Sequence, residues 1–429
     1  PSFFARVPAG KRRQPGLPPV SFFYTVKNAH VSRNIFRRNA GTRGSDMTSI
    51  QATRMLTPGP TPIPDRVRLA MAAPLIHHRK DAFKTILAEN QIMLKELFCT
   101  TSPIIPLASS GTGGMNAAAF NLFQPGERVL VATAGYFGNR WVDIVKTRGL
   151  DPVVLSRPAG ESFDPEEIRA MLDADPSIRG VFMQISETST GVLHPVQEIA
   201  AVTRERDVLL VADGISAVSI SPARMDDWGI DCLITGSQKG LMLPPGLAFV
   251  ALSPRAWKKA ESVRPQCYYF DLIQERACCE KNQTHYTSPI SLLVGLHEAL
   301  TMLREFGMDN VFKKQRALTS MARTGISAMG MELFVKDERR CTWGLTSIRM
   351  PDDIPAGPVV ARAFKDWGVI LTAGQGDLKD KVLRLAHMGW IDWADLAAGL
   401  HALAWSLPVR PGGAYLEAAL AAYHRTLED

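Results

Sequence analysis

Several features that define whole classes of protein are missing from this sequence of 429 residues. No apolar run reaches the ~18 residues that a membrane helix needs, and the longest, Val208–Ile220, is interrupted by Asp213. The six cysteines include no CxxC pair, and the nine histidines show no spacing such as HExxH. We therefore expect no metal site, no disulfide framework and no membrane span, and we expect a reducing compartment, the cytoplasm.

Acidic residues are nearly absent from the first tenth of the chain. Residues 1–46 hold nine lysines and arginines and one acid, Asp46, whereas 47–429 hold 40 basic and 41 acidic residues. The net charge of +7 therefore comes from this leader, and the rest of the chain gives no reason to expect nucleic acid. We expect the leader to be disordered. Alternatively, it is a mitochondrial transit peptide or sequence upstream of a start at Met47.

Apolar runs alternate with helical patterns from about residue 62. The runs read as strands buried on both faces of a mostly parallel sheet, and they lie at 180–185, 208–212, 231–235 and 247–252. Further patterns predict helices at 114–123, 138–148 and 390–405 and a strand at 342–350. The predicted fold is α/β, with an N-terminal arm (47–62), a large domain (63–306) and a smaller C-terminal α/β domain (307–429).

Two short segments after predicted strands carry candidate chemistry. Ser109–Gly114 precedes a helix, so its backbone N–H groups and hydroxyls can hold an anion. It is neither GxGxxG nor a Walker A sequence, and alone it is equally well a tight connection. Asp213 follows the strand 208–212, where a carboxylate can hold a cationic ring nitrogen. Taken alone, Asp213 is better interpreted as a turn or cap residue.

Lys239 follows the strand 231–235 among small residues. Burial there would disfavour the ammonium and make the amine a nucleophile for a Schiff base, although an isolated loop lysine is usually solvated. Together, an anion cradle, an acid and a lysine at one sheet edge match the needs of pyridoxal 5'-phosphate. Its phosphate needs donors, its pyridine nitrogen needs a carboxylate, and its aldehyde needs an amine.

The sequence resembles the class V, fold-type I pyridoxal-phosphate aminotransferases, and among them the alanine–glyoxylate and serine–pyruvate aminotransferase group. The resemblance covers nearly all of 52–407. It is carried by the segments Leu56–Pro62, His77–Arg79, Ser109–Gly114, Glu187–Gly191, Gly236–Lys239, Pro244–Gly246 and Arg384–Gly389.

This resemblance implies a cofactor site. Lys239 would bind the cofactor covalently and shuttle a proton, Asp213 would pair with the ring nitrogen, and Thr188 would lie near the ring hydroxyl. Phe137 stands where the family often has a tryptophan stacked on the ring. The residues implied to hold the phosphate are Ser110, Gly111, Thr112 and Gln238.

The resemblance also implies a substrate site and a partner. Arg384 would grip the substrate carboxylate bidentately, and Gly59 would line the pocket. Thr287 would reach the phosphate of a neighbouring subunit, which implies a homodimer with shared active sites. Two positions depart from the family: Thr284 replaces a frequent aromatic, and Ala386 replaces a usual glycine.

The implied reaction is ping-pong transamination from alanine or serine to a small 2-oxo acid, glyoxylate or pyruvate. One alternative is another class V reaction, such as cysteine desulfuration. It needs a mobile cysteine, for which Cys341, opening the predicted strand, is the only candidate in the small domain. Desulfurases also usually carry a histidine where Gln238 stands. The other alternative is a non-catalytic complex subunit, such as a soluble hydrogenase small subunit, but no iron–sulfur or nickel pattern is present.

Overall fold

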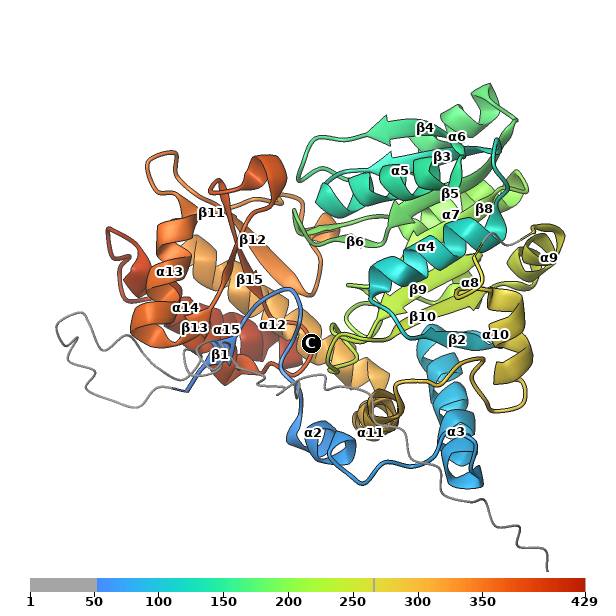
Figure 1. Cartoon of the computed structure of the whole chain (residues 1–429). Coiled ribbons are helices and arrows are strands. Elements are labelled where there is room, and N and C mark those ends of the chain that lie inside the picture. Colours follow the sequence, from blue (N-terminus) through green and yellow to red (C-terminus); the bar gives the residue numbers. More distant parts are fainter. Residues whose placement is uncertain (1–51, 265–266, 429) are drawn as a thin grey trace, which may run out of the picture. The chain divides into compact units, whose positions relative to one another are not determined.

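The computed structural model describes residues 52–264 and 267–428 (Figure 1). The predicted basic leader, 1–46, and the first residues of the predicted arm lie outside the described residues. Within the described part of the chain, no helix is both long enough and apolar enough to cross a membrane.

The larger sheet has seven strands in the order β2-β10-β9-β8-β5-β3-β4. Only β10 is antiparallel to its neighbours, so the other six strands of this sheet share one direction. The predicted mostly parallel sheet is confirmed, and nearly every residue of its four central strands is buried. The strands are β2 (Ile104–Leu107), β3 (Arg128–Thr133), β4 (Asp151–Ser156), β5 (Ile178–Gln184), β8 (Leu209–Asp213), β9 (Cys232–Gly236) and β10 (Ala248–Leu252).

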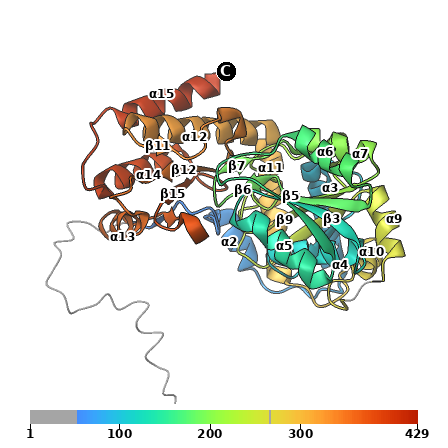
Figure 2. The same cartoon turned by 90° about the horizontal axis from the view of Figure 1, so that it is seen from above.

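Helices cover both faces of this sheet because strand side chains alternate in direction. In β3, Leu130 joins one buried apolar cluster, whereas Val129 and Val131 join another. The first cluster contains residues of α3, α6, α7 and α11, and the second contains residues of α4, α5, α9 and α10 (Figure 2). The helices of this part are α2 (Asp65–Met71), α3 (Asp81–Phe98), α4 (Gly111–Leu122), α5 (Tyr136–Arg148), α6 (Pro165–Ala174), α7 (Val196–Glu205), α8 (Met225–Trp228), α9 (Pro254–Ser262), α10 (Leu272–Cys279) and α11 (Ile290–Phe306).

A second, antiparallel sheet has the order β11-β12-β15-β14 and a separate apolar cluster. Its strands are β11 (Glu332–Leu333), β12 (Leu345–Arg349), β14 (Thr372–Ala373) and β15 (Val382–Ala386). Its helices are α12 (Met308–Ala328), α13 (Ala356–Trp367), α14 (Trp393–Ser406) and α15 (Tyr415–Glu428). Two short pairs complete the strands: β1 (Arg54–Met55) is parallel to β13 (Val369–Ile370), and β6 (Ser186–Glu187) forms a hairpin with β7 (Val192–Leu193).

Several predicted boundaries were wrong by two or three residues. Helix α4 begins at Gly111 and not at 114. Its glycines, which the sequence suggested were part of a loop, form the first turn of the helix, where N–H groups have no partner within the helix. Helix α14 begins after Asp392, whose side chain caps it by accepting from the N–H groups of Ala394 and Asp395. Cys341 does not open β12. It lies four residues before that strand and forms an isolated β-bridge with Val192.

Candidate active site

The carboxyl ends of five strands meet at one edge of the larger sheet and supply a single cavity. Strands β2, β3, β5, β8 and β9 each lead into a segment that lines it. Eight of the predicted site residues lie around this cavity: Ser110, Gly111, Thr112, Phe137, Thr188, Asp213, Gln238 and Lys239. Residues separated by more than a hundred positions are therefore brought together as the strand order predicts.

Lys239 lies in the turn that follows β9, where it is half-buried in the wall of the cavity. Its Nζ donates to the backbone carbonyl of Pro58 in the N-terminal arm. Burial lowers the pKa of this amine to about 8, with Asp213 acting in the opposite direction and Arg384 adding to the lowering. About a tenth of the amine is therefore uncharged at pH 7, far more than for an ordinary lysine, and the uncharged form is the one that a nucleophile or proton acceptor requires.

Asp213 is the last residue of β8, and only 6% of its surface is exposed. Its Oδ1 accepts from the backbone N–H of Ile215 at 2.8 Å. Burial raises the pKa of the carboxyl to about 6, and the nearby Glu187 adds to the rise, while Ile215 and Lys239 oppose it. A cation placed beside this carboxylate is stabilised by it and would in turn lower its pKa.

The N-terminus of α4 faces the cavity without a side-chain cap. The hydroxyl of its N-cap residue, Ser110, makes no cap hydrogen bond. The N–H of Gly113 donates to the carbonyl of Ser110 at 2.8 Å, whereas those of Gly111 and Thr112 remain available. A Cβ at Gly111 would lie 2.5 Å from the side chain of Ile215, so a larger residue would not fit without rearrangement. Gln238 lines the same cavity, and the NH2 group of its side-chain amide can donate to an anion. Together these groups form a polar pocket with unpaired N–H donors, which is the kind of site that binds a phosphate.

Arg384 is a buried residue of β15 that reaches toward this site. Its Nη1 donates to the carbonyl of Thr188 at 3.0 Å, and Nε and Nη2 donate to the carbonyl of Ala373 at 3.2 and 3.0 Å. Burial lowers the pKa of this guanidinium to about 10, against the raising effect of Glu187. Two of its five N–H groups have no partner among the described residues and can donate to a ligand.

Two further predicted residues, Gly59 and Thr287, are not among the residues that line the cavity. Gly59 lies against Lys239, since a Cβ added to it would be 2.5 Å from the lysine Nζ. Thr287 is exposed and does not line the cavity. It borders a separate depression together with Tyr269 and Tyr286. The structure therefore brings Gly59 to the site and leaves Thr287 away from it within this chain.

Sequence reasoning missed Arg140 and Glu187. Arg140 lines the cavity and donates through Nη1 to Oγ1 of Thr112 at 2.8 Å. Glu187 is completely buried and accepts from the N–H groups of Gly138 at 2.8 Å and Ser189 at 3.0 Å. No local signal marked Arg140. Glu187 opened a segment that was quoted for the resemblance, but the sequence carries no sign of its burial.

The donor set fits pyridoxal 5'-phosphate. The uncapped helix terminus and the amide NH2 of Gln238 suit its phosphate, the buried carboxylate of Asp213 suits its ring nitrogen, and the partly neutral amine of Lys239 suits its carbonyl carbon.

Comparison with known proteins identifies the family. The aminotransferase class-V family model matches residues 67–377. The "Soluble hydrogenase 42 kDa subunit" of Anabaena cylindrica is 33% identical over 81% of this chain and 91% of its own length. The "Serine--glyoxylate aminotransferase" of Methylorubrum extorquens is 34% identical over 82% of this chain and 90% of its own.

A solved structure agrees with these relatives. The ureidoglycine–glyoxylate aminotransferase of Bacillus subtilis superimposes with a TM-score of 0.84 at 28% identity, covering 88% of this chain and 99% of that one. The fold-type I architecture is thereby confirmed. The chain belongs to the class V aminotransferase family, and its cofactor is pyridoxal 5'-phosphate.

Proposed function

We propose that this enzyme transfers the amino group of a small amino acid, alanine or serine, to a small 2-oxo acid, glyoxylate or pyruvate, by a ping-pong mechanism. The observation that carries the proposal is the buried Lys239 amine, with a pKa of about 8, in one cavity with the buried Asp213 carboxylate. The names of the Methylorubrum and Bacillus proteins both include glyoxylate, and the first also includes serine and the second ureidoglycine. Those names support glyoxylate as acceptor more strongly than they support one donor.

The proposed roles follow from the chemistry of each side chain. When bound, pyridoxal phosphate supplies the carbonyl and the electron-withdrawing ring that carry the amino group between the two substrates. Lys239 is the point of covalent attachment and, when free and uncharged, accepts the α-proton of the donor. Asp213 holds the ring nitrogen protonated, Phe137 stacks on the ring, and Thr188 lies near the ring hydroxyl. The phosphate is held by Ser110, Gly111, Thr112 and Gln238.

Arg384 is proposed to bind the carboxylate of both substrates. Its bonds to the carbonyls of Thr188 and Ala373 support this role because they fix the plane of the guanidinium before a substrate arrives. Gly59 is proposed to line the substrate pocket beside Lys239, where its missing side chain leaves space.

A homodimer with shared active sites is part of the proposal. The exposed hydroxyl of Thr287, which does not line the cavity of its own chain, is available for the phosphate of a second copy. We also propose that 63–306 and 307–429 are separate domains, supported by their separate sheets and apolar clusters. A reducing, cytoplasmic location is supported by six free cysteines.

The competing desulfurase reaction has little support from Cys341. This thiol is buried, donates to the carbonyl of Glu338 at 3.0 Å, and has a pKa raised chiefly by burial. A nucleophilic cysteine needs the opposite, a depressed pKa and access to the substrate. A purely non-catalytic subunit would have no use for the perturbed amine of Lys239 and carboxyl of Asp213 in one cavity.

A half-reaction screen tests the proposed function. The purified protein with its cofactor is mixed with alanine, serine, aspartate or cysteine and no acceptor, and both the cofactor absorption band and the 2-oxo acid formed are measured. We expect about one equivalent of 2-oxo acid per subunit from alanine or serine, followed by return of the band on adding glyoxylate or pyruvate.

Three results would count against the proposal. They are sulfide release from cysteine without amino transfer, no reaction with any donor, and a Lys239→Ala variant that keeps both the covalent absorption band and wild-type turnover. The first would favour a lyase, and the second would favour the complex-subunit alternative.

A further inference from the structure

Arg140 combines a part-buried hydrogen bond with a charge that no described carboxylate neutralises, at the edge of the cofactor cavity. It lies in the first part of α5, and its Nη1 donates to Oγ1 of Thr112 at 2.8 Å. Its guanidinium carbon lies 5.0 Å from the ring centroid of Phe137 and 5.8 Å from that of Tyr136. No carboxylate within the described residues forms an ion pair with it. The guanidinium is thus held in place while most of its N–H groups stay uncommitted.

Among the residues that line the cavity, Arg140 is the one cation available to the phosphate of the cofactor. Among the residues that line it, the charged ones are Arg140, Asp213 and Lys239. Asp213 has the wrong sign, and Lys239 is engaged by the cofactor carbonyl in the proposed function. The predicted cradle of Ser110, Gly111, Thr112 and Gln238 offers only neutral donors. A phosphate carries nearly two negative charges at neutral pH, and such a group is rarely placed away from water without a cation.

The start of the helix that carries Arg140 is held by a buried carboxylate. The buried Glu187 carboxylate accepts from the N–H groups of Phe137 and Gly138, at 3.4 and 2.8 Å, and so holds the start of α5. Because α5 carries both Phe137 and Arg140, these contacts fix the backbone from which both side chains extend, and the bond to Thr112 places the guanidinium beside the first turn of α4. An arginine held this way loses little side-chain entropy when it binds an anion.

We propose that Arg140 is a cofactor-binding residue that supplies the positive charge for the phosphate of pyridoxal 5'-phosphate, with Thr112 as the link between the guanidinium and the cradle. The inference rests on the proposed roles of the α4 N-terminus and of Lys239. It predicts that Arg140 discriminates between pyridoxal 5'-phosphate and pyridoxal, which has the same ring and aldehyde but no phosphate.

Equilibrium binding to cofactor-free protein tests this directly. Dissociation constants for pyridoxal 5'-phosphate and for pyridoxal are measured from the quenching of tryptophan fluorescence in wild type, Arg140→Gln and Arg140→Lys. For Arg140→Gln we expect affinity for pyridoxal 5'-phosphate to fall about 10- to 100-fold, as for the loss of a charged hydrogen bond. Affinity for pyridoxal should change by less than about twofold. Arg140→Lys, which keeps the charge, should recover part of the loss.

Matched controls separate a charge effect from a structural one. Lys146→Gln removes one positive charge from an exposed position on the same helix and should leave both constants unchanged. Inorganic phosphate should compete with pyridoxal 5'-phosphate in wild type and about tenfold more weakly in Arg140→Gln. Circular dichroism establishes that each variant is folded.

Three outcomes overturn the inference. Equal losses of affinity for the two ligands would make Arg140 a structural residue. Unchanged cofactor affinity with a raised KM for the amino donor would assign it to the substrate carboxylate. Unchanged binding of all ligands would remove it from the site. If wild type itself does not prefer pyridoxal 5'-phosphate over pyridoxal, it is the proposed phosphate cradle that fails, and not the role of Arg140 alone.

Discussion

Glu187 is a carboxylate with no exposed surface and four donors directed at it. The N–H groups of Phe137, Gly138 and Ser189 and the hydroxyl of Ser189 all point to its oxygens, and the hydroxyl lies at 2.6 Å. Backbone donors at the start of α5 therefore compensate for the cost of burying this charge. The carboxylate acts as the cap that α5 lacks from its own N-cap residue, Gly135.

Replacing Glu187 by glutamine should lower the free energy of unfolding by about 2 kcal/mol. The amide NH2 group would face N–H groups that need an acceptor, and bonds to a charged group are stronger than neutral ones. Urea denaturation of the cofactor-free protein measures the change. The control is Glu161→Gln at an exposed position, expected to change stability by less than about 0.5 kcal/mol. Equal effects of the two substitutions would show that the Glu187 network contributes little.

Gly59 provides a second residue-scale prediction. Its φ of +119° is unfavourable for other residues, and an added Cβ would lie 2.5 Å from Nζ of Lys239. We expect Gly59→Ala to push the lysine aside and to lower kcat/KM at least tenfold, with a weaker covalent cofactor band. Gly330→Ala is the matched control, because Gly330 also has a positive φ, +77°, but has nothing within 4 Å of its added Cβ.

Both glycine variants carry a backbone cost, which should be larger at the φ of +119° than at +77°, and only Gly59→Ala adds a contact with Lys239. Gly330→Ala should therefore lose roughly 1 to 2 kcal/mol of stability and keep its activity, whereas Gly59→Ala should lose at least as much stability and most of its activity. The idea is wrong if Gly59→Ala turns over at the wild-type rate, or if Gly330→Ala loses activity to the same extent.

The place of some candidate residues in the fold was predictable, and that of others was not. Asp213 directly follows a continuous apolar run and Lys239 lies a few residues after another, and that pattern locates a strand end, although only the two together with the glycine-rich turn indicated a site. Arg140 follows no such signal. An arginine in an amphipathic helix is usually solvated, and only the approach of α5 to α4 gives it Thr112 as a partner.

At the scale of elements, strands were easier to predict than helix starts. The four buried strands lie within two residues of their predicted positions, because apolar residues on both faces leave few alternative registers. The start of α4 was misplaced because Gly111, Gly113 and Gly114 have low helix propensity. In the structure they are the residues that let the helix approach its neighbours, since a Cβ at Gly114 would lie 2.9 Å from Ile234 of β9.

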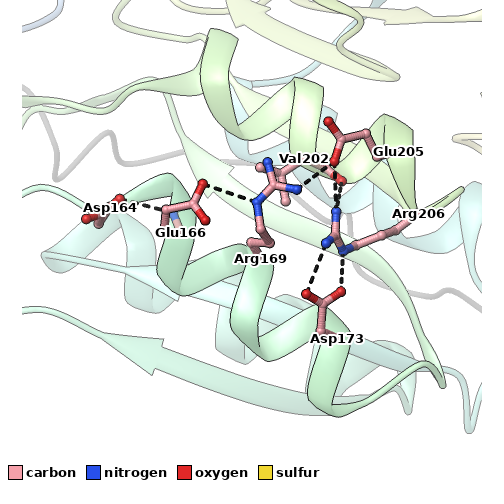
Figure 3. Close-up of polar contacts among 7 residues, drawn as sticks. All are labelled: Asp164, Glu166, Arg169, Asp173, Val202, Glu205 and Arg206. Carbon is pink, nitrogen blue, oxygen red and sulfur yellow. Dashed lines mark hydrogen bonds and ion pairs between the residues drawn. The ribbon is translucent and has the colours of Figure 1, made fainter.

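Helices α6 and α7 are joined at the surface by a network of charged side chains (Figure 3). Arg206 binds both oxygens of Asp173 at 2.7 and 3.0 Å and also Glu205 at 3.1 Å. Arg169 connects Glu166 to the same Glu205. Because Glu205 is shared between the two arginines, ordering one pair reduces the entropy cost of the other.

This network predicts a salt-dependent contribution to stability. Arg206→Gln should lower the urea midpoint at low ionic strength, and the difference from wild type should shrink at about 1 M salt, where the Debye length is ~3 Å. Arg179→Gln, at an exposed position with no ion pair among the described residues, is the control and should show no such trend. A difference that stays constant with salt would mean that Arg206 acts through packing of its side chain and not through its charge.

At the scale of the whole chain, the site is completed by segments far apart in sequence. Residues 54–55 pair with β13, and a few residues later the carbonyl of Pro58 meets Lys239. Arg384, from the second sheet, bonds to the carbonyl of Thr188 beside the larger sheet. Sequence periodicity predicted the helices and strands but not the bonds from Lys239 and Arg384 to backbone carbonyls. Every residue has a carbonyl, so the sequence does not distinguish the one that accepts such a bond. Only the family resemblance had pointed to Gly59 and Arg384.

Two histidines are completely or almost completely buried, one beside each sheet. His387 follows β15, where its Nδ1 faces the amide nitrogen of Gln315 at 3.3 Å and its Nε2 faces Oγ1 of Thr346 at 3.1 Å. His194 follows β7 and lies 3.1 Å from the hydroxyl of Ser162. Burial lowers the pKa of each imidazole to about 3, so both are neutral in the folded protein at ordinary pH.

These histidines should make the protein lose stability in mild acid. The unfolded chain takes up their protons below about pH 6.5, and the folded chain does so only near pH 3, so stability is full above pH 6.5 and falls as the pH decreases. Between pH 7 and pH 5 each histidine should cost about 2 kcal/mol, from 1.36 kcal/mol per pKa unit. His387→Gln should therefore reduce the pH 7 to pH 5 loss by about that amount, measured by urea denaturation at both values, whatever its effect at pH 7. His424→Gln, at an exposed position, is the control. If His387→Gln and wild type lose equal stability on acidification, another group carries the pH dependence.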